Sequence, residues 1–276
     1  MQSSSSASRE AIRSRNNVSV RGEGTQPMLF AHGFGCDQTM WRYVAPAFER
    51  DYRVYLFDYV GCGKSDWSAY DAQRYATLDG YAQDVLDIVR AYDLRDVVFV
   101  GHSVSAVVGL LASIREPGRF AKHILIGPSP CYVNQGDYVG GFDRKDIEGL
   151  LDLMDKNYIG WAAFLAPVVM GTPERPDLVD ELQQSFCATD PRMTRAFARA
   201  TFLSDNRADL GKVGTPALIL QCAQDAIAPT SVGEYVHRAL RGSTLRQMQA
   251  TGHCPHMSHP QETVQLMKEY LAPAGR

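Results

Sequence analysis

Gly101-His102-Ser103-Val104-Ser105 lies between an apolar run at residues 96–100 and an Ala- and Val-rich run at residues 106–112. The first run predicts a buried strand and the second a helix, so the chain turns sharply at the serine. Such a strand–turn–helix is typical of a nucleophile elbow, which pushes a serine hydroxyl out of the sheet. The usual pattern is G-x-S-x-G, and Ser105 replaces its second glycine with a residue that is still small. We therefore predict Ser103 as a nucleophile; the alternative is a buried strand followed by a serine-capped helix.

A serine nucleophile needs a histidine base, and the histidine needs a carboxylate to orient it. In folds with such an elbow the order is serine, acid, histidine, each on a loop after a strand. Asp225 follows the apolar run 216–222, and His253 follows residues 243–249, which alternate polar and apolar side chains. Alone, the aspartate could be a turn residue and the histidine a helix cap. Their order and placement favour a catalytic triad of Ser103, Asp225 and His253.

A fourth element is predicted near the start of the chain. The apolar strand at residues 28–31 runs into His32-Gly33-Phe34-Gly35, a Gly-rich loop of the kind that presents a backbone N–H to an oxyanion. We expect the oxyanion-hole donors to be the N–H groups of Phe34 and Val104, where negative charge develops as a carbonyl becomes tetrahedral. An ordinary Gly-rich turn is the alternative.

The order of strand and helix patterns predicts an α/β fold. We expect strands at residues 18–21, 28–31, 53–57, 97–100, 123–126, 217–221 and 244–249, and helices at 78–92, 232–240 and 260–271. This alternation predicts a mostly parallel sheet with helices on both faces. The four candidate site elements then meet at the carboxyl ends of the strands.

One segment interrupts this alternation. Residues 132–205 contain no convincing strand but several amphipathic stretches, at 145–158, 161–170, 176–189 and 191–202. We predict a small all-helical cap at 132–205, inserted into a core formed by 16–131 and 206–273. The Ser- and Arg-rich residues 1–15 are expected to be a disordered tail, with a transit peptide as the alternative.

Composition excludes several classes of function. The 276 residues are 45% hydrophobic with a formal net charge of −3, so nothing indicates binding to nucleic acid or to an anionic membrane. No apolar run approaches the roughly 20 residues that span a bilayer. Six cysteines without close paired spacing predict free thiols in a reducing compartment, which favours a cytoplasmic protein.

Two motifs suggest a cofactor or metal but do not fit one. Gly61-Cys62-Gly63-Lys64-Ser65 ends like a phosphate-binding loop, yet Asp58 stands where that motif needs a glycine. His253, His256 and His259 recur every third residue, whereas helical zinc sites space histidines by four, and prolines interrupt this segment. We predict neither a cofactor nor a metal.

These residues resemble the α/β-hydrolases of the RsbQ type, bacterial regulators of the sigma-B stress response related to the plant strigolactone and karrikin receptor hydrolases. The resemblance runs from about residue 16 to about residue 271. Its motifs are residues 32–38, 56–61, 101–105 and 252–256. It implies an α/β-hydrolase fold, the triad named above and a helical cap over an apolar pocket. It also implies Trp161, Leu165, Phe202 and Ile227 as residues lining that pocket.

The predicted activity is acyl transfer on a small, hydrophobic, uncharged ester or lactone. The resemblance implies slow turnover and a sensor role, in which hydrolysis changes the cap and a PAS-domain signalling protein reads the change. The alternative is a metabolic carboxylesterase or lactonase with no signalling partner. A cofactor-free haloperoxidase-like side activity is a more remote reading.

Overall fold

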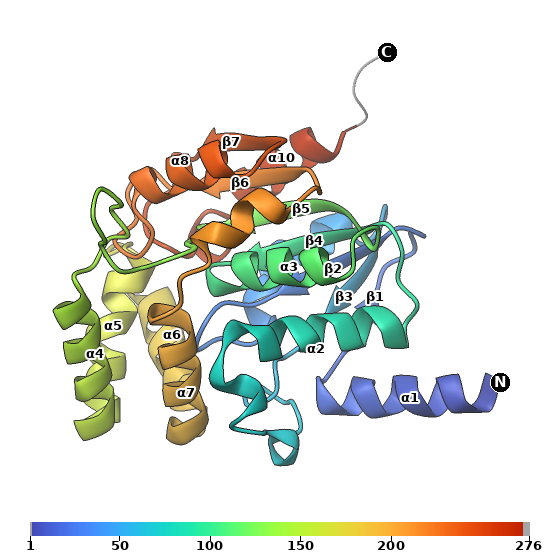
Figure 1. Cartoon of the computed structure of the whole chain (residues 1–276), viewed down its shortest axis with the longest axis horizontal. Helices are drawn as coiled ribbons and strands as arrows, with labels where there is room; N and C mark the ends of the chain where they lie inside the picture. Colours follow the sequence, from blue (N-terminus) through green and yellow to red (C-terminus); the bar gives the residue numbers. More distant parts are fainter. Residues whose placement is uncertain (1, 273–276) are drawn as a thin grey trace.

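A seven-stranded sheet forms the centre of the protein (Figure 1). The computed structural model describes residues 2–272. The strands lie in the order β1-β3-β2-β4-β5-β6-β7, and all neighbours are parallel except β1 with β3. They are β1 Ser19–Arg21, β2 Pro27–Ala31, β3 Arg53–Leu56, β4 Val97–His102, β5 Phe120–Ile126, β6 Ala217–Gln221 and β7 Ser243–Gln247. The predicted mostly parallel sheet is confirmed.

Helices cover both faces of this sheet. One face packs against α2 (Leu78–Ala91), α3 (Val104–Arg115) and α8 (Thr230–Ala239), and receives Leu29 and Phe99 from the central strands. The other face receives Phe30 and Val100 and packs against two short 3-10 helices and α10 (Pro260–Leu271). Because both faces are covered, β2 and β4 are buried along their whole length and read as continuous apolar runs.

Four helices follow β5 and precede β6 along the chain. They lie together on one side of the sheet in Figure 1. They are α4 Arg144–Lys156, α5 Tyr158–Met170, α6 Pro176–Cys187 and α7 Pro191–Phe202. An isolated β-bridge pairs Cys131 with Asp205, so the two ends of this segment leave the core side by side. We call the four helices the cap, and we place its boundaries at residues 132 and 205 as a proposal.

The structure differs from the sequence-based expectation at the N-terminus. Residues 2–15, predicted as a disordered tail, form helix α1 (Gln2–Arg15), which lies beside α2 in Figure 1. Arg15 anchors its end through ion pairs to Asp84 (3.4 Å) and Asp87 (2.9 Å) of α2. Ile12 packs against the core, and Arg9 lies over the ring of Tyr92. Because so few apolar side chains attach α1 to the core, its sequence shows almost no helical periodicity of hydrophobic residues. Met1, the first residue of the predicted tail, and residue 273, the last residue of the predicted core, lie outside the described residues.

Among the described residues, no helix combines the length and the apolar character needed to cross a membrane. All six cysteines are free thiols, and five of them are buried.

Candidate active site

Ser103 occupies a strained turn between β4 and α3. Its φ of +57° and ψ of −125° are rare for a residue with a side chain and cost roughly 1–3 kcal/mol. The N–H of Ser103 donates to the carbonyl of Ile126 in β5 at 2.8 Å, which holds the turn against the sheet. A Cβ at Gly101 would lie 2.6 Å from the carbonyl oxygen of Ser105, so only glycine fits there. This is the geometry of a nucleophile elbow.

Ser105, the departure from the usual elbow pattern, has a structural role of its own. Its side chain is fully buried and donates a hydrogen bond to the carbonyl of His32. Its Oγ also lies 2.9 Å from Oη of Tyr59. The hydroxyl therefore ties the first turn of α3 to the loop that follows β2, a contact that glycine cannot make.

Ser103, His253 and Asp225 form one continuous chain of hydrogen bonds. His253 Nε2 lies 2.8 Å from Ser103 Oγ, and its Nδ1 lies 2.7 Å from Asp225 Oδ2. The other carboxylate oxygen, Oδ1, accepts the N–H groups of Ile227 (2.8 Å) and Ala228 (3.0 Å). With its proton on Nδ1, the imidazole turns the Nε2 lone pair toward the serine hydroxyl. The three residues predicted as a triad are thus brought together, and each is buried.

The loop that carries His253 is attached to the cap. The backbone N–H of His253 donates to the carbonyl of Val169 in α5 at 2.8 Å. The preceding Gly252 has a φ of +80° and donates to the carbonyl of Gln224 at 2.7 Å. A Cβ at Gly252 would overlap the carbonyl oxygen of Met170, so this close approach requires glycine. Movement of α5 would therefore act directly on the backbone of the histidine.

The two predicted oxyanion donors lie beside the elbow. Val104 is the first residue of α3, and such a residue has no acceptor for its N–H within the helix. Phe34 lies in a turn that the N–H of Cys36 closes onto the carbonyl of Gly33 at 3.3 Å. A Cβ at Gly33 would lie 2.5 Å from the ring of His102, which precedes Ser103. Glycine at this position therefore lets the loop approach the elbow.

A small cavity of about 30 Å³ lies at Ser103, between the core and the cap. Its lining residues are Phe34, Cys36, His102, Ser103, Leu165, Val169, Leu182, Phe186, Thr201, Phe202, Ile227, His253 and Cys254. Leu165, Phe202 and Ile227, predicted as lining residues, are among them. Trp161 is not: it is buried behind the wall, with its ring 6.0 Å from that of Phe34 and 5.2 Å from that of Phe186.

Sequence reasoning missed two lining residues that an i, i+4 pattern could have indicated. Leu182 and Phe186 follow Leu178 at helical spacing on α6, and all three are buried. The pattern predicts a buried face but does not say that this face meets the catalytic cavity. The apolar wall therefore extends over α5, α6 and α7.

Tyr132 is a further residue beside the nucleophile that no motif indicated. It is 1% exposed, and its Oη lies 3.4 Å from Ser103 Oγ. Burial raises the pKa of Tyr132 to about 12, so the phenol keeps its proton and remains a donor. The loop after β5 brings this hydroxyl to Ser103.

The three histidines considered as metal ligands do not form a joint site. Both ring nitrogens of His253 face Ser103 and Asp225. A different set, His102, Cys254 and His256, offers ligand atoms within 4.8 Å of one another. Burial lowers the pKa of His256 to about 3 and raises the pKa of Cys254 well above its usual value. Since a metal binds the thiolate, it would have to displace the proton of the Cys254 thiol.

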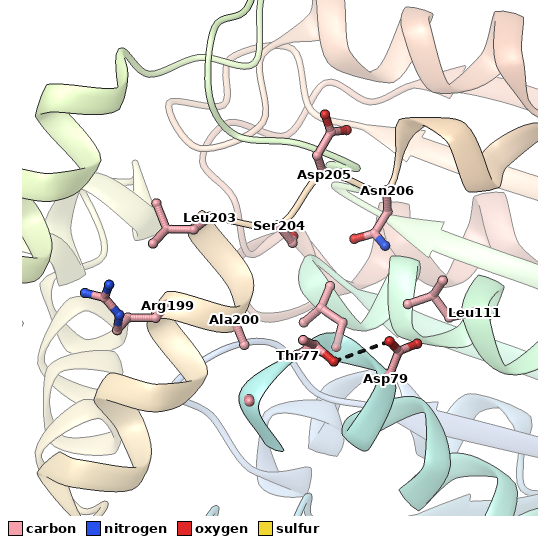
Figure 2. Close-up of a pocket in the computed structure, with 11 residues that line it drawn as sticks. Thr77, Asp79, Leu111, Arg199, Ala200, Leu203, Ser204, Asp205 and Asn206 are labelled. Atoms are coloured by element: carbon pink, nitrogen blue, oxygen red, sulfur yellow. Dashed lines mark hydrogen bonds between the residues drawn. The ribbon is translucent and has the colours of Figure 1, made fainter. Parts of the chain in front are cut away.

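A larger hollow of about 450 Å³ lies outside the catalytic cavity (Figure 2). Arg199 and Ala200 of α7 and the following Leu203 line one side, and Thr77 and Asp79 at the start of α2 line the other. None of the three triad residues lines this groove. The candidate triad therefore borders the smaller cavity and not this groove.

Comparisons with known proteins identify the family to which this fold belongs. Residues 28–266 match the model of the alpha/beta hydrolase family. The chain is 39% identical over 256 residues to a strigolactone esterase of Arabidopsis thaliana, covering 92% of this chain and 96% of that protein. It is 34% identical over 261 residues to the karrikin insensitive 2 receptor CA of Petunia hybrida, covering 94% and 97%.

The solved structure of a hydrolase from Oleispira antarctica is similar over almost the whole chain. Its TM-score is 0.94 at 46% sequence identity, covering 95% of this chain and 97% of that one. The mostly parallel sheet and these relatives agree. The chain belongs to the α/β-hydrolase family.

Proposed function

We propose that the protein is a serine hydrolase that cleaves a small, hydrophobic ester or lactone. The observation that carries this proposal is the unbroken hydrogen-bond chain from Ser103 through His253 to Asp225, at the base of an apolar cavity. Polymers and charged metabolites fit this site poorly, because apolar side chains make most of its wall.

The proposed mechanism has two half-reactions. His253 Nε2 takes the proton of Ser103 as Oγ attacks the carbonyl carbon, and the N–H groups of Phe34 and Val104 hold the resulting oxyanion. The histidine then gives its proton to the departing alkoxide oxygen, leaving an acyl-serine. A water molecule that loses a proton to His253 attacks this ester, and Ser103 leaves with that proton. Asp225 holds the imidazole tautomer throughout.

We further propose a signalling role of the RsbQ type, with a PAS-domain protein as partner. Two observations support it. Relatives that align over nearly the full chain are named as receptors. The cap also holds the backbone of His253 through Val169, so acylation or ligand binding at the triad and the position of α5 are mechanically linked. The cavity of about 30 Å³ is too small for a drug-sized ligand, whose pockets measure roughly 300–1,000 Å³. Ligand entry therefore requires the cap to move.

Burst kinetics test the hydrolase proposal. With p-nitrophenyl butyrate we expect a burst of about one p-nitrophenolate per protein, followed by turnover well below the typical enzyme rate of about 10 per second. Ser103→Ala should show neither phase. Hydrolysis by this variant at more than a tenth of the wild-type rate would exclude Ser103 as the nucleophile.

Thermal shift separates a sensor from a metabolic enzyme. We expect a slowly released ester to change the melting temperature of the wild-type protein for as long as the acyl group persists. Binding to a rigid pocket can only raise it by mass action, whereas a ligand that loosens the cap lowers it. Association with a purified PAS-domain protein of the same organism should depend on this acylation. Fast multiple turnover without ligand-dependent association would identify a metabolic carboxylesterase or lactonase instead.

A further inference from the structure

Thr201 lines the cavity at Ser103 and carries a buried hydroxyl without a partner in the described part of the chain. It lies near the end of α7, lines the cavity beside Phe202 and is 1% exposed. Its Oγ1 is buried and has no hydrogen-bond partner among the described residues. A threonine in a helix commonly satisfies its hydroxyl with the carbonyl four residues earlier. Thr194 of the same helix does so, with the carbonyl of Asp190 at 3.0 Å. A buried hydroxyl that is left unpaired lowers the stability of the fold, so the unpaired hydroxyl of Thr201 needs an explanation.

Most other polar side chains of the cavity are already engaged, and the exception is His102 Nδ1, which is buried without a partner among the residues that the structure describes. Ser103 and His253 bond to each other. His102 Nε2 bonds the carbonyl of His253 at 2.7 Å, and the opposite side of its ring faces Gly33. Ala200 and Leu203 line the larger groove (Figure 2), whereas Thr201 lines the cavity at Ser103.

We infer that the Thr201 hydroxyl donates a hydrogen bond to a second oxygen of the substrate, away from the carbonyl that is cleaved. This inference rests on the hydrolase proposed above and narrows its substrate class. The substrate is an ester or lactone that carries an ether, carbonyl or hydroxyl oxygen on an otherwise apolar body. A site with a buried hydroxyl discriminates against an analogue that lacks the matching group, because the hydroxyl then stays unpaired in the complex. Thr201 is thus a specificity residue.

Matched esters test this inference. Each straight-chain p-nitrophenyl ester from butanoate to hexanoate is compared with the ester in which one methylene of the acyl chain is replaced by an ether oxygen. The ratio of kcat/KM for the two esters defines the oxygen preference. Comparing this ratio between wild type and Thr201→Val cancels the intrinsic reactivity of each ester. Valine keeps the branched shape and removes the hydroxyl, whereas Thr201→Ser keeps the hydroxyl and removes the methyl group. Thr194→Val controls for the loss of a buried hydroxyl elsewhere in α7.

For at least one chain length, we expect Thr201→Val to lower the oxygen preference roughly 2- to 10-fold, the range for one hydrogen bond. Thr201→Ser and Thr194→Val should keep the wild-type preference. An unchanged preference in Thr201→Val at every chain length, with Ser103→Ala inactive, would overturn the role of Thr201 and leave the hydrolase proposal standing. A change equal to that in Thr194→Val would show a general loosening of α7 and would also overturn it.

A binding measurement keeps the two proposals separable. Phenyl ketones with the same alkyl and ether chains cannot be hydrolysed, and calorimetry gives their dissociation constants. If Ser103→Ala retains hydrolysis, the proposed nucleophile is wrong. Thr201 is then judged on these constants alone: we expect the ether ketone to lose affinity relative to its alkyl partner in Thr201→Val. No relative loss would contradict the inference whatever the nucleophile.

Discussion

Replacing Asp225 by asparagine tests the orientation of the catalytic histidine without changing the shape of the site. Asp225 Oδ1 accepts the backbone N–H groups of Ile227 and Ala228, at 2.8 and 3.0 Å. In Asp225→Asn the amide carbonyl oxygen must take this position, because an amide nitrogen there would face two donors. The amide NH2 group then points at His253 Nδ1, 2.7 Å from the position of Oδ2.

This reversal determines the size of the effect. An NH2 group donates to Nδ1, so the imidazole proton moves to Nε2, which faces Ser103 Oγ at 2.8 Å. A protonated neutral Nε2 cannot accept the serine proton. The corresponding change in serine proteases lowers kcat about 10⁴-fold, and we expect a similar loss, equivalent to about 5.4 kcal/mol of transition-state stabilisation. The fold should persist, because the shape and both backbone bonds are retained.

The assay is steady-state hydrolysis of p-nitrophenyl butyrate, with thermal melting of each variant as the control for folding. Ser103→Ala gives the activity floor. Asp225→Ala also loses the hydrogen bonds from the N–H groups of Ile227 and Ala228. Comparing it with Asp225→Asn separates the effect of the histidine tautomer from the effect of losing these two bonds in the loop. A cooperative melt together with more than about a tenth of wild-type kcat in Asp225→Asn would refute the assignment of Asp225 as the orienting acid.

Four further outcomes follow from the geometry. Ser103→Ala should lower ester hydrolysis by several powers of ten with little change in melting temperature, and a small loss would point to another nucleophile. EDTA should leave hydrolysis unchanged; inactivation that zinc reverses would implicate the cluster of His102, Cys254 and His256. Tyr132→Phe should lower kcat roughly 2- to 10-fold if its hydroxyl assists at Ser103, and an unchanged kcat would assign it to packing. Burial lowers the pKa of His123 from 6.5 to about 3, so stability should fall as pH drops from about 6.5 toward 3. On going from pH 7 to pH 5, urea unfolding should show a loss about 2 kcal/mol smaller in His123→Leu than in wild type, and equal losses would contradict this.

Local sequence patterns were sufficient to predict the strands of the sheet and the order of the candidate site residues along the chain. Strands buried on both faces read as apolar runs, so β2, β4 and β6 were predicted within one or two residues of their observed ends. The carboxyl ends of parallel strands meet at one edge, which is why Ser103, Asp225 and His253 could be grouped before any distance was known. The small residues around Ser103 reflect a steric need that is itself local.

Tertiary packing decided which side chains face the cavity. Trp161 and Leu165 are one helical turn apart on α5 and both buried, yet only Leu165 lines the pocket. Helical periodicity predicts a buried face but does not say which of its residues meets the ligand and which meets another helix. Thr201 looked like any polar residue of an amphipathic helix, because its missing partner becomes visible only when every neighbouring carbonyl has been placed.

The N-terminal helix shows the same division. Its Ser- and Arg-rich sequence carries too little apolar surface to predict a buried face, and its anchors lie far along the chain. Arg15 meets Asp84 and Asp87 only because α1 and α2 lie side by side. Apolar burial leaves a periodic trace in the sequence, since it acts on every turn of an element. A few ion pairs between distant segments leave none, so the sequence determined the sheet and the order of the candidate catalytic groups, and the tertiary structure decided α1, Tyr132 and Thr201.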